Sequence, residues 1–129
     1  MSSEPTESNA QALLICSDLF FTSKVTSTGK EFGIEFQVVF AKPQSLKKNC
    51  TTPYSFAVLD LESSDFAVEE LLESAGIITD DTAVLAFGSH VNVNRLNEAK
   101  EAGCRDVMPR SRFTAELPQL LQDYASQSR

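Results

Sequence analysis

Five short apolar runs, each followed by a segment with helical character, constrain the fold of this chain most strongly. The runs predict strands at residues 12–16, 34–40, 54–59, 82–87 and 104–108. The segments after them predict helices at residues 19–32, 45–48, 65–75, 91–102 and 114–124. Strands that alternate with helices over short connections build a parallel sheet with helices on both faces. We therefore predict an α/β fold, a three-layer (βα)5 sandwich around a parallel five-stranded sheet.

The third apolar run carries the clearest signal for burial. Residues 56–59 follow one another without polar alternation, and Asp60 ends the run. A continuous apolar run predicts a strand that is covered on both faces. The run at 34–40 alternates in its first half, which is typical of an edge strand with one solvated face.

The predicted helices have end residues that suit them. Glycine follows three of them, at Gly33, Gly76 and Gly103, where it can adopt the left-handed conformation that ends many helices. Hydroxyl side chains precede three of them as candidate N-caps, at Ser63 or Ser64, at Ser89 and at Thr114.

The length of 129 residues predicts a single domain, since it suffices for one hydrophobic core and not for two. Residues 1–10 are predicted to be a disordered N-terminal tail, because the segment is rich in Ser, Glu, Pro and Thr. The domain itself is predicted at 11–126, and residues 127–129 are predicted to be a C-terminal tail.

Charge and hydropathy exclude several classes of partner. The net charge of −7 argues against binding to nucleic acid or to an anionic membrane surface. No apolar run approaches the roughly 20 residues that a membrane-spanning helix needs. The first ten residues lack the basic and apolar regions of a signal peptide, so we expect a cytoplasmic protein.

The cysteines and the single histidine form no evident metal or catalytic site. Cys16, Cys50 and Cys104 are odd in number and widely spaced, which predicts neither a disulfide framework nor a metal-ligand pair. Cys16 and Cys104 fall in strand-like runs and are interpreted as small buried hydrophobes. His90 is interpreted as an exposed residue near the start of a helix.

Polar residues cluster where the predicted strands end. In a doubly wound sheet of strand order 2-1-3-4-5, the carboxyl ends of the strands face one crevice, and ligands bind there. The residues at these ends are Ser17-Asp18, Asp60, Gly88-Ser89 and Pro109-Arg110. Two carboxylates suit Mg²⁺, and an arginine can pair with phosphoryl oxygens. The sequence therefore predicts that two carboxylates, one hydroxyl and one guanidinium converge, those of Asp18, Asp60, Ser89 and Arg110.

This pattern resembles the receiver domain of bacterial response regulators, which has a flavodoxin-like fold. The resemblance covers residues 12–124 and rests on four stretches, Leu-Leu-Ile-Cys-Ser-Asp18, Phe-Ala-Val-Leu-Asp60, Ala-Val-Leu-Ala-Phe-Gly-Ser89 and Glu-Ala-Gly-Cys-Arg-Asp-Val-Met-Pro-Arg110. It implies that Asp60 is the phosphoacceptor. It also implies a Mg²⁺ ion held by Asp18, Asp60 and the backbone carbonyl of Glu62.

The same resemblance implies a phosphate-binding group and a partner. Gly88 and Arg110 fall in the columns of the family's phosphate-binding hydroxyl and lysine, and Ser89 reaches the hydroxyl column if the strand shifts by one residue. The implied partner is a histidine kinase or another signalling protein. The resemblance implies no catalytic residue and specifies no oligomeric state, and the protein is not expected to be an enzyme.

The departures from the family pattern are as informative as the matches. Ser17 replaces the first acid of the acidic pair, and Arg110 replaces the lysine and is followed by Ser111 in place of proline. Gly88 falls in the hydroxyl column, and Val107 falls in the column of the aromatic residue that moves with that hydroxyl. The chain therefore resembles a divergent, stand-alone pseudo-receiver. If Asp60 is phosphorylated, its signal leaves by a route other than the hydroxyl–aromatic pair.

Three hypotheses for the function follow. The first is a signalling domain that accepts a phosphoryl group on Asp60, and the second is an interaction module that works without phosphorylation. The third, a small flavodoxin-like enzyme, lacks a nucleophile–base pair and a cofactor loop. Structural roles stay open beside these: Asp60 as an acceptor for backbone N–H groups, Asp18 and Ser89 as N-caps, and Arg110 as the partner in an ion pair.

Overall fold

A computed structural model describes residues 10–51 and 53–127. Its centre is one sheet of five strands, β1 (Ala10–Ile15), β2 (Ile34–Val39), β3 (Phe56–Asp60), β4 (Ala83–Gly88) and β5 (Asp106–Pro109). All neighbouring strands pair in parallel, and the order is β2-β1-β3-β4-β5. The predicted fold class and strand order are therefore confirmed.

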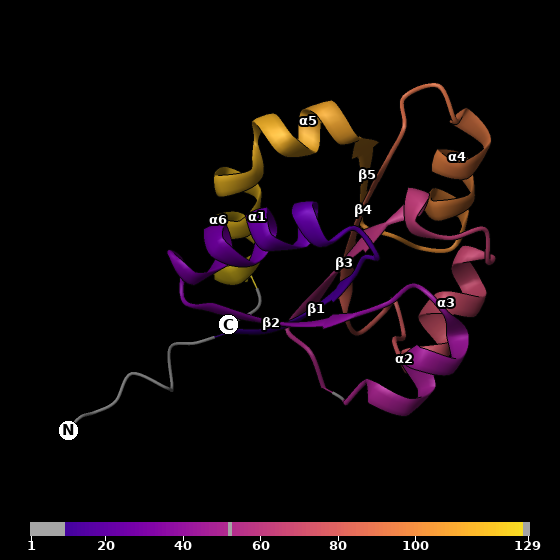
Figure 1. Ribbon diagram of the computed structural model, residues 1–129, viewed down its shortest axis with the longest axis horizontal. Helices are drawn as coiled ribbons and strands as arrows, with labels where there is room; N and C mark the ends of the chain where they lie inside the picture. The colour runs from indigo at the N-terminus through magenta and orange to yellow at the C-terminus, as the bar shows by residue number, and fades with distance from the viewer. Residues whose placement is uncertain (1–9, 52, 128–129) are drawn as a thin grey trace.

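Six α-helices of the described residues cover the two faces of this sheet, as Figure 1 shows, and a short 3-10 helix, η2 (Leu61–Ser63), follows β3. The α-helices are α1 (Leu19–Lys30), α2 (Pro43–Asn49), α3 (Val68–Ser74), α4 (Val93–Glu101), α5 (Arg110–Ala115) and α6 (Leu117–Gln127). Helices α1, α5 and α6 lie on one face, and α2, α3 and α4 lie on the other. None of the helices in the described part of the chain is long and apolar enough to span a membrane.

The ordered elements begin at Ala10 and end at Gln127, so each end lies one residue outside the predicted domain. The predicted N-terminal tail otherwise falls on residues 1–9, which lie outside the described residues, as do 128 and 129 at the other end.

Two hydrophobic cores lie on opposite faces of the sheet. One lies under α2, α3 and α4 and includes Leu46, Leu71 and Ala99. The other lies under α1, α5 and α6 and is rich in aromatic residues. The rings of Phe21, Phe87 and Phe113 pack against one another there. Every residue of β3 is buried, as the continuous apolar run predicts. Asp60 is thereby carried to the carboxyl edge of a strand that is covered on both faces.

Several predicted helix starts are wrong, because residues other than the predicted hydroxyl side chains stand at the helix starts. Helix α3 starts at Val68, three residues after the predicted start, and neither Ser63 nor Ser64 caps it. The cap of α4 is Asn92 in place of Ser89. Thr114 lies inside α5 rather than before a helix.

The three glycine stops are confirmed by their backbone conformation. Gly33, Gly76 and Gly103 all have positive φ, at 73°, 73° and 100°. A side chain at Gly103 would in addition place its Cβ 2.6 Å from the Thr79 hydroxyl oxygen. Both the conformation and the close approach therefore require glycine at this turn.

We expect Gly103→Ala to lower the free energy of unfolding by about 1–3 kcal/mol, because alanine is strained at this φ and collides with Thr79. Urea denaturation measures the loss. The exposed helical substitution Glu101→Ala serves as the control and should change stability by less than about 0.5 kcal/mol. Equal stability of the two variants would contradict the conclusion that the turn requires glycine at position 103.

Candidate functional site

Asp60 ends β3 and is the only charged residue that is buried in the described part of the chain, at 2% exposure. Its Oδ1 accepts the backbone N–H of Glu62 at 3.0 Å, and its Oδ2 accepts the hydroxyl of Ser63 at 2.9 Å. Arg110 Nη2 donates to both oxygens, at 3.2 and 3.3 Å. A buried carboxylate needs such donors to offset its lost hydration. Residues of this chain therefore supply the hydrogen bonds that the Asp60 carboxylate needs.

Cys16 adds a further donor to Asp60, which the sequence does not predict. Its Sγ lies 3.4 Å from Asp60 Oδ2. Burial raises the pKa of the Cys16 thiol, so the group keeps the proton that it donates. The register pairs Ile15 with Leu59, and the residue after Ile15 therefore lies beside Asp60. The interpretation of Cys16 as a buried residue is confirmed, at 1% exposure, but its polar contact was missed.

Arg110 begins α5, directly after the last strand, and lies across the site. Besides its bonds to Asp60, its Nη1 is 4.0 Å from Asp18 Oδ2. Its guanidinium carbon lies 4.9 Å from the centroid of the Phe21 ring and 5.5 Å from that of Phe87. These rings favour a cation at that position. The structure thus brings Asp18, Asp60 and Arg110 together.

Asp18 has two roles at the start of α1. Its Oδ1 accepts the Phe21 backbone N–H at 3.1 Å, so Asp18 is the N-cap of this helix. Its other oxygen faces Arg110, and the side chain is 48% exposed. The preceding Ser17 accepts the N–H of Ala41 at 3.3 Å and gives its own N–H to Ser63. Ser17 therefore ties neighbouring loops together where receiver domains have an acid.

Gly88 and Ser89 lie beside Glu62, and within the described residues neither makes a side-chain hydrogen bond to Asp60. Glu62 Oε2 accepts the backbone N–H of Ser89 at 3.1 Å. A Cβ at Gly88 would lie 3.1 Å from that same oxygen, which is tighter than ordinary contact. The Ser89 hydroxyl accepts the N–H of Val91 at 3.4 Å. Glycine at 88 thus leaves room for the Glu62 side chain to reach the next loop.

Glu62 contributes to the site through its N–H group and its side chain. The resemblance implies a role for its backbone carbonyl as a metal ligand, and that role stays a prediction. The loop after Asp60 is also held by α4, through Arg95 and Glu98, neither of which the sequence singles out. Their spacing of three residues on a helix is the signal that could have found them.

The residues around Asp60 do not fit Mg²⁺ as they are arranged. Mg²⁺ is bound through carboxylates, waters and phosphate oxygens in octahedral geometry. Arg110 already contacts both carboxylates, and Ser17 supplies a hydroxyl in place of a third. Within residues 10–51 and 53–127, no group of three His, Cys, Asp or Glu side chains could hold a metal. The guanidinium supplies the positive charge in the described arrangement.

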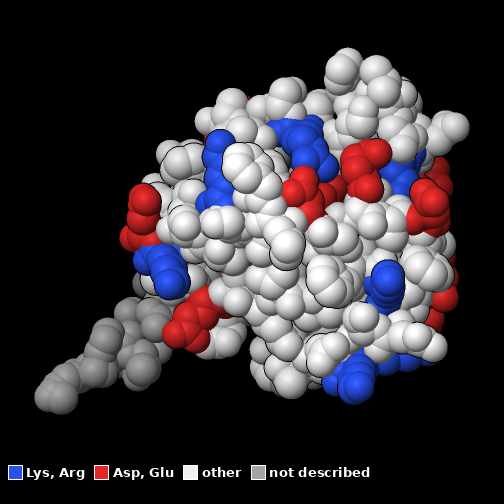
Figure 2. Space-filling model, in the orientation of Figure 1, with Lys and Arg blue, Asp and Glu red and all other residues white. Residues whose placement is uncertain are grey.

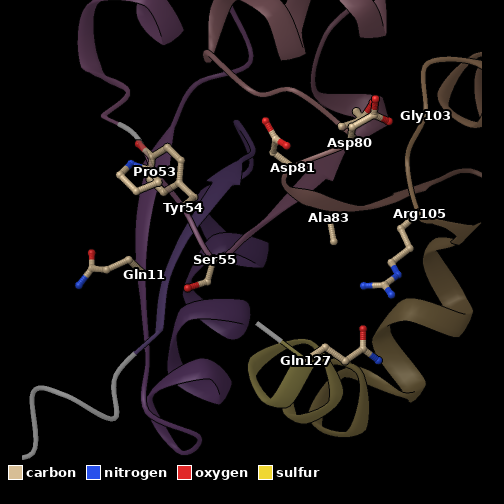
Figure 3. Close-up of a pocket in the computed structure, with 11 residues that line it drawn as sticks. Gln11, Pro53, Tyr54, Ser55, Asp80, Asp81, Ala83, Gly103, Arg105 and Gln127 are labelled. Atoms are coloured by element: carbon tan, nitrogen blue, oxygen red, sulfur yellow. The ribbon is translucent and has the colours of Figure 1, made fainter. Parts of the chain in front are cut away.

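A cleft with a volume of about 800 Å³ lies elsewhere in the described chain (Figure 3). It is lined by residues before β3 and β4, among them Ser55, Asp80 and Asp81, and by Arg105 before β5. This is the opposite edge of the sheet from Asp60. Asp80, Asp81 and Arg105 are exposed, whereas small-molecule sites have convergent polar groups in an enclosed apolar pocket. We assign no ligand to this cleft.

The charged side chains are mixed in sign on the face shown in Figure 2. Basic and acidic side chains intersperse over its upper half, without a continuous basic surface among the described residues of this face. Nucleic acid binds extended basic surfaces. The face in view therefore lacks the extended basic surface that nucleic acid binds.

Comparisons with known proteins identify structures that share this fold. No protein-family model matches the chain, and no curated protein matches it. Solved structures do match. The receiver domain of the Francisella response regulator 1452 has 18% identity and a TM-score of 0.72, over 94% of this chain and 100% of that one. A response regulator receiver protein from Pseudoalteromonas atlantica has 13% identity and a TM-score of 0.74, over 92% and 99%.

A third similar structure is the receiver domain of a sensor histidine kinase from Pseudomonas aeruginosa. It has 13% identity and a TM-score of 0.71, over 92% of this chain and 98% of that one. That structure is described with a magnesium ion coordinated in its active site cleft. At these identities the similarity establishes the architecture, which agrees with the strand order and helix layers described above. This chain has the fold of response-regulator receiver domains.

Proposed function

We propose that this protein is a receiver-type signalling domain that acts by contact with a partner protein and not as an enzyme. The fold supports this proposal, and so does the placement of Asp60, Asp18 and Arg110 at the carboxyl edge of the sheet, where open α/β sheets bind ligands. The proposed partner is a histidine kinase or another signalling protein. The cytoplasmic location expected from the N-terminal composition stays a prediction.

One observation carries the finer proposal: Arg110 closes the site over Asp60. The guanidinium bonds to both carboxylate oxygens, and the Asp60 side chain is 1% exposed. An oxygen that is buried and hydrogen-bonded in this way cannot approach a phosphorus atom in line. We therefore propose that the closed protein binds its partner without phosphorylation, with Arg110 in the role of a fixed counter-ion.

Phosphoryl transfer to Asp60 is the second candidate. The location of Asp60 at the tip of β3 supports it, and so does the partial exposure of Arg110, 35% for its side chain. In this reaction an Asp60 oxygen attacks the phosphorus of an acyl phosphate, the P–O bond to the donor breaks, and the donor leaves as a carboxylate. Arg110 must first release that oxygen. Mg²⁺ at Asp18 and Asp60 belongs to this candidate, since it requires the same displacement.

The two candidates are separated by incubating the protein with acetyl phosphate and Mg²⁺ and measuring the intact mass. We expect the mass to stay unchanged. Asp60→Asn is the matched control, because asparagine has the same shape and forms no acyl phosphate. A phosphoryl adduct that forms on the unmodified chain and not on Asp60→Asn would overturn the first candidate, binding without phosphorylation, and would establish the second.

A further inference from the structure

We propose that α4 responds to the state of Asp60 through a clamp formed by Glu62, Arg95 and Glu98. The proposal deepens the second candidate above, phosphoryl transfer to Asp60, and rests on it in one respect, namely that the state of Asp60 changes. It describes the contacts through which a change at Asp60 reaches the surface of helix α4. The positions where receiver domains have a hydroxyl and an aromatic residue hold Gly88 and Val107 here, so this chain needs another path.

Glu62 is the first part of the clamp, because it contacts both Asp60 and the start of α4. Its backbone N–H donates to Asp60 Oδ1 at 3.0 Å. Its side-chain Oε2 accepts the N–H of Ser89 at 3.1 Å and lies 3.5 Å from the amide nitrogen of Asn92, the N-cap of α4. A movement of the Glu62 backbone that follows Asp60 therefore changes the contacts at the helix start.

Arg95 is the second part, and it holds the loop after Asp60 at two places. Its Nε donates to the carbonyl of Leu61 at 3.1 Å, and its Nη2 donates to the carbonyl of Ser64 at 2.9 Å. The two carbonyls flank the segment that contains Ser63, whose hydroxyl donates to Asp60. The Arg95 side chain is 10% exposed. A nearly buried guanidinium with fixed partners transmits displacement, because losing a bond there is costly.

Glu98 is the third part and joins Arg95 to α3. Its Oε1 accepts a hydrogen bond from Arg95 Nη1 at 2.8 Å, and its Oε2 accepts one from the Val68 N–H at 2.8 Å. The Glu98 carboxylate thus caps α3 in place of a local side chain. Desolvation acts to raise the pKa of Glu98, but the bonds from Val68 and Arg95, together with the charge of Arg95, hold the pKa below its ordinary value. The carboxylate thus stays ionised near neutral pH.

Together these contacts join the loop at 61–68 to α4 through the side chains of one helix face. A change at Asp60 that alters its bonds to the Glu62 N–H and the Ser63 hydroxyl shifts the loop, and Arg95 passes the shift to α4. Arg95 acts here as a positioning residue, since it touches the backbone of the loop and not Asp60 itself. Coupling of this kind needs direct measurement.

The test uses Asp60→Asn as the perturbation and amide NMR shifts as the measurement. In the otherwise unmodified chain, the substitution should shift amides at 61–68 and also at 92–99. In an Arg95→Met background, which keeps the apolar length and removes the donors, the shifts at 61–68 should remain. Those at 92–99 should fall to less than about half. Lys100→Met, on the exposed face of the same helix, is the control background and should leave the α4 shifts unchanged.

Undiminished α4 shifts in the Arg95→Met background would overturn the clamp, and so would the absence of α4 shifts in the otherwise unmodified chain. If Arg95→Met does not fold, Glu98→Gln provides the second background and should weaken the α4 shifts in the same sense. No step of the test uses a phosphodonor or a partner. Failure of the clamp is therefore distinguishable from failure of the proposed function.

Discussion

Replacing Arg110 with methionine should lower the free energy of unfolding by about 2–3 kcal/mol. The substitution leaves the buried carboxylate of Asp60 without its counter-charge, a type of change that usually costs about 3–5 kcal/mol. The cost is reduced here because Arg110 is partly exposed and because Glu62 and Ser63 still donate to Asp60. Denaturation in urea at neutral pH measures the loss.

Two controls sharpen this prediction. Arg112→Met removes an exposed arginine whose partner, Glu116, lies one helical turn away, and it should cost less than about 0.5 kcal/mol. The double substitution of Arg110→Met with Asp60→Asn removes both charges, so it should cost less than the sum of the single changes. If Arg110→Met proves as stable as Arg112→Met, the ion pair has no structural role.

Phe113→Ala should have the largest effect on stability, a loss of about 3–5 kcal/mol. Phe113 is fully buried, its ring stacks on Phe87 with the centroids 4.1 Å apart, and it also contacts Phe21. Truncation removes this area and leaves a cavity beneath the two rings that flank Arg110. Chemical denaturation measures the difference from the unmodified chain.

The matched control is Phe20→Ala, because Phe20 is a phenylalanine of the same domain that is 86% exposed. This change should alter stability by less than about 0.5 kcal/mol. Equal losses for Phe20 and Phe113 would mean that the aromatic core does not carry the stability that its packing implies.

The fold and the centre of the site could be predicted from the sequence because they depend on local patterns. The unbroken apolar run at 56–59 identifies a central strand, and parallel strands bring their carboxyl ends to one edge. That geometry alone places Asp18, Asp60 and Arg110 near one another, as the structure has them.

The start of α3 and the clamp could not be predicted, because they depend on partners far apart in the chain. Helix α3 begins at Val68 because Glu98, thirty residues later, accepts its first N–H group. Ser63 is a plausible cap by sequence, but its hydroxyl donates to Asp60 instead. Cys16 is recognisable as buried, yet its bond to Asp60 depends on the register between β1 and β3. Tertiary contacts override local propensity at each of these positions.

The central claim is that Arg110, and not a metal ion, balances the charge of Asp60. A Mg²⁺ titration followed by amide NMR shifts tests it most directly, with the unmodified chain and Arg110→Met compared under the same conditions. We predict no saturable shift at Ser17, Leu61 or Glu62 in the unmodified chain and saturable shifts there in Arg110→Met. Saturable Mg²⁺ shifts around Asp60 in the unmodified chain would contradict the claim.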